Sequence, residues 1–285
     1  MLENHGVHPA RFWVRKASVR GELEVVLAGD SRVFRGLSPS AMKGTLAGRS
    51  VANLGFSGAC LCGRYLSYVE AALDPRARTP LIVLGITPHS LTAHAAKDNG
   101  YVAEARRSRS EALERAYLTP AMDFFEPVTM KAVSNAWTGA GRPPTRYVQR
   151  FADDGWVASD LEPPEPDGAL REYEAVLGAS PVDRGLVAAL VATTARWAQR
   201  GVRVVGFRPP VSARMRELED RLGAFDEPEL QRRFVGAGGE YLVFDDAAYP
   251  TYDGSHVGAA VALALSRDLA ARLGGAPRES APGTP

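Results

Sequence analysis

Cysteine is nearly absent from this 285-residue chain, in which Cys60 and Cys62 are the only two. Two cysteines are too few for a disulfide scaffold, and the single residue between them makes a mutual disulfide geometrically awkward. No histidine stands at ligand spacing from the pair, so a zinc site is not expected, and the favoured interpretation is two small core residues. We expect neither a metal nor a cofactor.

Long apolar runs and an excess of either charge are also lacking. No stretch reaches the roughly 18 apolar residues of a membrane span, and the N-terminus lacks the apolar core of a signal peptide. We therefore expect a cytoplasmic protein, or an extracytoplasmic one if the natural chain is longer at its N-terminus. The formal net charge is +1 and the 34 basic residues are scattered, which gives no case for binding to nucleic acid or to an anionic membrane. The oligomeric state is left open.

The sequence does contain enough apolar residues for a full core, since they make up 45% of the chain. They occur in short runs that alternate with helical patterns. This alternation predicts a three-layer α/β/α, flavodoxin-like sandwich around a five-stranded, mostly parallel sheet. The expected strands are 23–28, 50–54, 79–86, 202–207 and 241–244, and the expected helices begin near Val33 and cover 39–47, 61–73, 183–199, 212–222 and 257–273.

The expected organisation is an N-terminal arm (1–20), one domain (21–275) and a flexible tail (276–285). Regularity breaks between about 90 and 180, where a surface helix over roughly 100–117 and a hairpin turning at Asp153-Asp154-Gly155 are predicted. This insertion follows the third strand, so it lies at the carboxyl edge of the sheet, where such folds bind ligands. It is either a cap that shapes a substrate cleft or a purely structural insertion.

Ser31 is a candidate nucleophile because the first apolar run ends in Gly29-Asp30-Ser31. Gly29 permits a tight turn, and the helix that follows would direct free N–H groups at the serine oxygen. Negative charge develops at such a place in acyl transfer. Taken alone, the three residues also fit an ordinary turn from strand to helix.

Asp253 and His256 form a second candidate group, three residues apart and just beyond the fifth strand. This spacing allows the carboxylate to accept a hydrogen bond from one imidazole nitrogen while the other faces outward. Ser31 and His256 would then stand on the same sheet edge, which is the arrangement that a nucleophile, a base and an orienting acid require.

With these pieces in place, the chain resembles the SGNH, or GDSL-type, hydrolase superfamily, including its divergent branch of acyl and O-acetyl transfer proteins. The matching blocks are Gly29-Asp30-Ser31, Asn53-Leu54-Gly55-Phe56-Ser57-Gly58, Leu84-Gly85-Ile86-Thr87 and Asp253-Gly254-Ser255-His256. The resemblance implies that Ser31 is the nucleophile, His256 the base and Asp253 its orienting acid. It also implies that the backbone N–H groups of Ser31 and Gly58 form an oxyanion hole.

One block departs from the family pattern, because Thr87 stands where an asparagine usually supplies a third oxyanion donor. The threonine hydroxyl can donate in its place, but it is shorter. The expected activity is hydrolysis of short acyl esters, acetyl esters among them, through an acyl-enzyme. The alternatives are transfer of the acyl group to a carbohydrate or other hydroxyl acceptor, and a binding or scaffold protein without turnover. The expected substrate is a small-molecule or carbohydrate ester.

Two further residues are candidate substrate contacts. His89, two residues past Thr87, is placed to donate to an oxyanion or to contact substrate, although a surface-loop histidine is an equal interpretation. Arg208 follows the fourth strand on the same edge and could hold an anionic group, with a salt bridge to the insertion as the alternative. Asp30 is expected to accept backbone N–H bonds in the turn.

Overall fold

The computed structural model describes residues 6–97, 99–119 and 146–274. Its central sheet has the strand order β2-β1-β3-β6-β7, and every neighbouring pair is parallel. The predicted five-stranded parallel sheet is therefore confirmed. The strands are β1 (Val25–Ala28), β2 (Val51–Asn53), β3 (Leu81–Gly85), β6 (Arg203–Phe207) and β7 (Glu240–Leu242).

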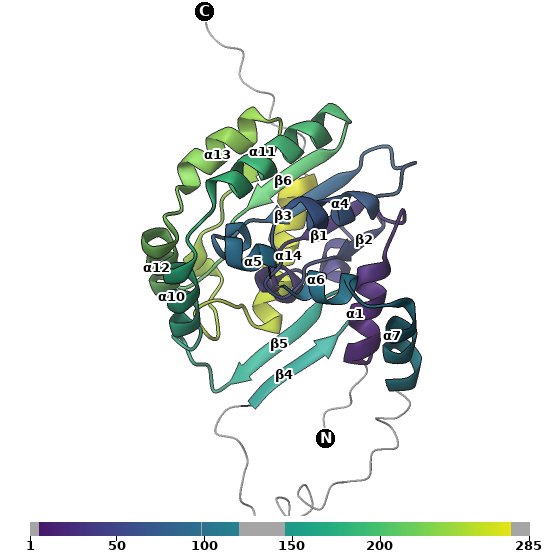
Figure 1. Ribbon diagram of the computed structural model, residues 1–285, viewed down its shortest axis with the longest axis horizontal. Coiled ribbons are helices and arrows are strands. Elements are labelled where there is room, and N and C mark those ends of the chain that lie inside the picture. The colour runs from purple at the N-terminus through teal and green to yellow at the C-terminus, as the bar shows by residue number, and fades with distance from the viewer. Residues whose placement is uncertain (1–5, 98, 120–145, 275–285) are drawn as a thin grey trace, which may run out of the picture.

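Helices cover both faces of the sheet and complete three layers (Figure 1). One face carries α4 (Gly63–Ala71), α11 (Arg184–Gln199) and α13 (Glu227–Gly236), and the other carries α2 (Ser31–Gly36), α3 (Pro39–Met42) and α14 (Ala259–Gly274). The predicted helix over 39–47 is shorter than expected, because the chain leaves the helix after Met42 and turns through Ala47 at φ 52°. The helix α13 was not predicted from the sequence.

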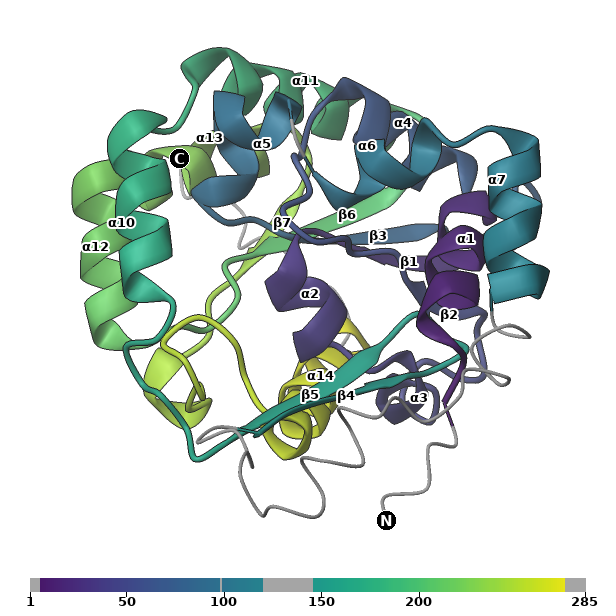
Figure 2. The ribbon, with the colours of Figure 1, turned by 60° about the horizontal axis from the view of Figure 1, so that its bottom comes forward.

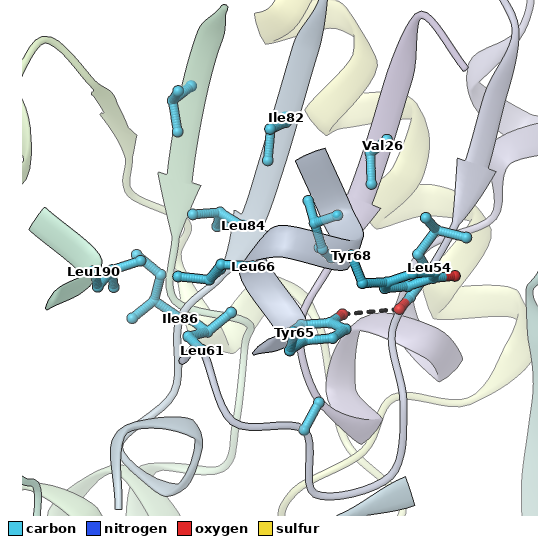
Figure 3. Packing of buried hydrophobic residues seen from close by; sticks show 14 of the residues in the cluster. Val26, Leu54, Leu61, Tyr65, Leu66, Tyr68, Ile82, Leu84, Ile86 and Leu190 are labelled. Atoms are coloured by element: carbon cyan, nitrogen blue, oxygen red, sulfur yellow. Dashed lines mark hydrogen bonds between the residues drawn. The ribbon is translucent and has the colours of Figure 1, made fainter. Parts of the chain in front are cut away.

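The larger part of the core lies between the sheet and α4, where aromatic and aliphatic side chains interleave (Figure 3). Val26, Ile82 and Leu84 point from the central strands toward Leu66 and Tyr68. The Tyr65 hydroxyl donates to the carbonyl of Leu54 at 2.8 Å, which ties α4 to the segment that follows β2. The helix thus fixes the loop that carries the second family block.

The described part of the segment 1–20 contains the helix α1 (Pro9–Ser18). Phe12 is 3% exposed and packs with Phe34 and Val157 in a small core of its own. The buried ammonium of Lys16 donates to the carbonyl of Gly155 at 2.8 Å. The helix therefore holds the turn of the inserted hairpin.

The insertion begins with the single turn η1 (His89–Leu91) and α5 (Ala93–Lys97), and the predicted single helix over 100–117 is wrong. The structure has α6 (Gly100–Ala105), α7 (Arg109–Leu113) and the π-helical turn η2 (Glu114–Leu118) instead. The break has a local cause. Ser108 and Glu111 form a capping box that starts a new helix.

The predicted hairpin is confirmed as the antiparallel pair β4 (Arg146–Phe151) and β5 (Val157–Glu162). Figure 2 shows α2 between the central sheet and this hairpin. The indole N–H of Trp156 donates to the carbonyl of Arg35 at 2.7 Å, and Asp160 accepts from the N–H of Ala259 at the start of α14. At the hairpin turn, the N–H of Asn53 in β2 donates to the carbonyl of Asp154 at 2.9 Å.

The remaining described elements of the insertion and the C-terminal half lie beside the carboxyl edge of the sheet. They are α10 (Leu170–Ala179), α12 (Ala213–Gly223) and the single turn η3 (Asp246–Ala248). The helices α10 and α12 pack on each other through a separate small core that includes Tyr173, Leu177 and Met215. The predicted tail (276–285) lies outside the described residues, as does part of the predicted insertion.

Among the helices of the described residues, none is both long enough and apolar enough to cross a membrane.

Candidate active site

The turn from β1 into α2 presents Ser31 at the carboxyl edge of the sheet. Gly29 has φ +152°, and a Cβ there would lie 2.4 Å from the Val33 side chain and 2.8 Å from the carbonyl oxygen of Gly85. Only glycine fits this close approach of backbone to side chain. Asp30 is the N-cap of α2 and accepts from the N–H of Arg32 at 3.0 Å, so it has the turn-stabilising role that we expected.

The structure brings Ser31, His256 and Asp253 together. Ser31 Oγ lies 2.8 Å from His256 Nε2, and His256 Nδ1 lies 2.8 Å from Asp253 Oδ2. The other carboxylate oxygen of Asp253 accepts from the backbone N–H groups of Ser255 and His256 at 2.9 and 2.7 Å. These bonds fix the carboxylate so that one oxygen orients the imidazole and the imidazole faces the serine.

The electrostatics of this relay favour a neutral imidazole. Burial lowers the pKa of His256, the nearby charge of Arg35 lowers it further, and the hydrogen bond to Asp253 opposes both effects. Burial alone would raise the pKa of Asp253, but the hydrogen bond to His256 and its other donors hold that pKa below the ordinary value. At neutral pH the pair is therefore a carboxylate next to an imidazole that can accept a proton.

A cleft of about 650 Å³ opens in front of the relay. Arg35, Gly58 and His89 also line the cleft, and the later part of the insertion contributes Glu165, Glu172 and Tyr173. Leu161 of β5 and Val176 of α10 are the larger aliphatic residues in a lining that is otherwise small or polar. The described part of the insertion therefore does shape the cleft.

Gly58 and His89 are neighbours in this cleft. A Cβ on Gly58 would lie 3.5 Å from His89 Cε1. Ser31 is the first residue of α2, a position whose N–H has no acceptor within its own helix. Burial lowers the pKa of His89, which leaves its ring neutral, with one N–H to donate. Ser31, Gly58 and His89, all named from the sequence, thus line the same cleft.

Thr87 does not join them. It is fully buried, and its hydroxyl donates to Asp30 Oδ2 at 2.6 Å. Thr87 Oγ1 itself accepts from the N–H of Ser90 at 3.1 Å. The expected role as a third oxyanion donor therefore does not fit the structure, because the hydroxyl proton is committed to a carboxylate below the surface of the cleft and Thr87 is not among the residues that line it.

Arg208 also lies away from the cleft that contains Ser31, contrary to its expected role as a substrate contact. Its side chain is 2% exposed, and its guanidinium forms ion pairs with Glu219, Asp220 and Glu227, at 2.8, 2.8 and 2.9 Å. The alternative of a salt bridge is nearer to the structure, although all three partners come from α12 and the start of α13 and none from the insertion.

The same Glu219 pairs with Arg32, the residue after the candidate nucleophile, at 2.6 Å. Arg32 Nε donates to the hydroxyl of Ser255, and that hydroxyl donates to the hydroxyl of Tyr173. Burial alone would raise the pKa of Glu219, but the charges of Arg32 and Arg208 hold it below its ordinary value. This buried cluster links the turn that carries Ser31 to the loop that carries His256.

Several residues of the cleft were missed from the sequence, Arg35 and Tyr173 among them. Arg35 stands four positions after Ser31, and this spacing in a predicted helix was a usable signal that both side chains share one face. Tyr173 offered no such signal, because it lies in the insertion, 142 positions from Ser31, and reaches the cleft only through the packing of α10 on α12.

No family model matches this chain, and no curated protein matches its sequence. Two solved structures are similar in the course of the chain. One, from Streptococcus pneumonia, is described as a candidate platelet activating factor; it shares 15% identity and a TM-score of 0.40, over 93% of this chain and 90% of the other. The second is Est24, a carbohydrate acetylesterase from Sinorhizobium meliloti, with 13% identity and a TM-score of 0.38, over 87% and 97%. The fold, as the sheet order and register given above establish, is the three-layer α/β/α arrangement that the resemblance to SGNH hydrolases implied.

Proposed function

We propose that the chain is a serine ester hydrolase that works through an acyl-enzyme. The observation that carries this proposal is the continuous relay from Asp253 through His256 to Ser31, with hydrogen bonds of 2.8 Å at both steps and an open cleft in front of the serine. A scaffold protein would have no need to keep a serine, an imidazole and a carboxylate in this order and geometry.

In the proposed reaction, Ser31 Oγ attacks the ester carbonyl while His256 Nε2 takes its proton. Asp253 holds the imidazole in the tautomer that presents Nε2 as an acceptor, and it stabilises the imidazolium that forms. The tetrahedral intermediate collapses when His256 gives the proton to the leaving alcohol. Water then attacks the acyl-enzyme with the same imidazole as base, which releases the acid and restores Ser31.

The oxyanion of the intermediate needs donors that point at it before the reaction begins. We assign this role to the backbone N–H groups of Ser31 and Gly58. The neutral ring of His89, beside Gly58, supplies the third donor in place of Thr87. Its contact with Gly58 and its position on the cleft wall support this assignment.

The lining of the cleft favours a small, polar ester. Leu161 and Val176 are too few to cover a long acyl chain, whose burial would yield about 0.8 kcal/mol per methylene only against apolar walls. Short acyl groups, acetyl among them, leave the alcohol part of the ester against the polar wall of the insertion.

The experiment that tests the function is active-site labelling combined with ester turnover. A fluorophosphonate probe is expected to label the wild-type protein and the Ser67→Ala control, which changes an exposed serine of α4, but neither Ser31→Ala nor His256→Ala. Short-chain p-nitrophenyl esters should follow the same pattern. Labelling of Ser31→Ala at the wild-type rate would refute the assignment of the nucleophile.

Transfer to an alcohol is the alternative outcome for the same acyl-enzyme. It is separated from hydrolysis by adding a polyol or sugar acceptor to the ester assay and measuring acylated acceptor against free acid. Under the proposal the acid is the main product at every acceptor concentration.

A further inference from the structure

Arg32 and Arg35 lie in the helix that begins with Ser31, and Arg208 is joined to Arg32 through Glu219. Arg35 differs from the other two. Arg32 and Arg208 both pair with Glu219, and Arg208 has two more carboxylate partners. Arg35 has no carboxylate partner among the described residues. Each of the three has one buried guanidinium nitrogen without a partner, so the difference lies in the carboxylates: the hydrogen bond that the Arg35 guanidinium makes is a 3.4 Å contact from Nη1 to the hydroxyl of Tyr252.

The position of Arg35 is set by the same helix that positions Ser31. Residues four apart on a helix share one face, with roughly 5–6 Å between their Cβ atoms. Both side chains line the cleft. Arg35 also lies against the rings of Phe34 and Tyr147, at 5.2 and 5.7 Å, and these rings hold the guanidinium in place without neutralising its charge.

The cleft contains two carboxylates that form no ion pair among the described residues, Glu165 and Glu172. Both residues are exposed to solvent, so water satisfies their charge and they need no partner. Arg35 is only partly exposed, and a half-buried cation without an acid beside it is costly unless a ligand supplies the anion. Arg35 therefore differs from Glu165 and Glu172 in its burial, and this difference, not the number of charges in the cleft, makes it the candidate anion site.

We propose that Arg35 binds a carboxylate of the ester substrate, within a few bonds of the carbonyl that Ser31 attacks. The inference rests on the ester hydrolase function proposed above and names its substrate class: esters in which either the acyl or the alcohol part is anionic. A guanidinium can hold such a group through two parallel N–H bonds, which fixes the orientation of the substrate as well as its affinity.

The test compares two matched pairs of esters. For the alcohol side the pair is 4-acetoxybenzoate and methyl 4-acetoxybenzoate, and for the acyl side it is p-nitrophenyl hydrogen glutarate and p-nitrophenyl methyl glutarate, each corrected for spontaneous hydrolysis. The wild-type protein is expected to prefer the anionic member of at least one pair by about tenfold or more in kcat/KM, the usual effect of a charged hydrogen bond. Arg35→Met should bring that ratio to about one, and Arg35→Lys should retain part of it.

A matched control is Arg64→Met, which removes an exposed arginine of α4 and should keep the wild-type ratio. Binding is measured separately by titrating the two anionic esters, 4-acetoxybenzoate and p-nitrophenyl hydrogen glutarate, into Ser31→Ala. The neutral methyl ester of each is titrated in the same way. This variant should bind the anion about tenfold more tightly than its ester, and Ser31→Ala/Arg35→Met should bind both alike.

The outcomes separate the two proposals. Hydrolysis of both members of each pair at similar rates, or a preference for the neutral members, would overturn the role of Arg35 and leave the hydrolase intact. Absence of any ester turnover would count against the hydrolase, and the titration of Ser31→Ala would then still decide whether Arg35 selects an anion. Equal binding of acid and ester in that titration would overturn the inference.

Discussion

Arg32 and Arg35 stand three residues apart in α2, yet they belong to different regions of the molecule. Arg32 points into the protein, where Glu219 and Ser255 occupy its donors at 2.6 and 3.0 Å. Arg35 lines the cleft, and no carboxylate of the described residues forms an ion pair with it. The short helix α2 thus contributes one arginine to the buried cluster and one to the cleft.

The comparison teaches that burial, and not the residue type, decides what an arginine does here. The charged groups of the buried region are paired with one another, and a change to one of them leaves its partners unpaired. The cleft contains groups such as Arg35 that contribute little to the stability of the fold and are free to bind a ligand. The following predictions test this contrast, first through stability and then through activity.

Glu219→Gln is expected to have the largest effect. Glu219 is fully buried and accepts from both Arg32 and Arg208, so its neutralisation leaves two buried cations without their shared anion. Removal of one partner from a buried ion pair costs about 3–5 kcal/mol in the free energy of unfolding. Urea denaturation measures this loss as a lower midpoint at constant slope.

The control for this variant is Glu217→Gln, which changes an exposed carboxylate of the same helix, α12. It should shift the free energy of unfolding by no more than about 0.5 kcal/mol. Equal stability of the two variants would mean that the buried cluster is not what joins the turn of Ser31 to the loop of His256.

Thr87→Val should have an intermediate effect. The change removes the hydroxyl that donates to the buried carboxylate of Asp30, and an unmet buried acceptor costs about 1–3 kcal/mol of stability. Turnover per folded molecule should fall by much less than the loss that follows removal of an oxyanion donor, and Thr87→Asn should not raise turnover. A loss of about 10²–10³ in kcat with unchanged stability would instead restore Thr87 as an oxyanion donor.

Arg35→Met should have the smallest effect on stability, less than about 1 kcal/mol, because no described carboxylate depends on it. Its effect appears in the pH profile. The charge of Arg35 lowers the pKa of His256, so its removal raises that pKa. The protonated imidazole cannot accept the proton of Ser31, and the acidic limb of kcat/KM for a neutral ester should therefore move to higher pH. An unmoved limb would place Arg35 too far from His256 to influence it.

The sequence was sufficient for the sheet and for the grouping of Ser31 with His256 because both depend on local signals. Apolar runs of four to eight residues mark buried strands, and parallel strands deliver their carboxyl ends to one edge. A glycine that must accept a φ of +152° marks the turn between β1 and α2. Each of these constraints acts within a few residues, so a single sequence displays it.

The errors concern residues whose role depends on distant partners. Whether the hydroxyl of Thr87 meets substrate or Asp30 depends on how β3 sits beside the end of β1, and no residue near Thr87 in the sequence indicates the answer. Arg208 was placed on the correct edge, but the three acids that enclose it come from later helices. The helix break at Ser108 was readable, since its capping box is a local pattern.

The hairpin turn beside β2 has a consequence for the behaviour of the protein in concentrated solution. The strand β2 is an edge of the sheet, and an unpaired edge offers N–H and C=O groups to the edge of another molecule. Here the N–H of Asn53 is taken by the carbonyl of Asp154, and Gly155 approaches so closely that a Cβ would lie 2.0 Å from the carbonyl oxygen of Asn53. A bulkier residue at Gly155, which has φ +87°, would move the turn away from β2 and leave the edge of that strand unpaired and open to association with another molecule. The insertion that lines the cleft therefore also covers the edge strand β2 and reduces the tendency of the sheet to self-associate.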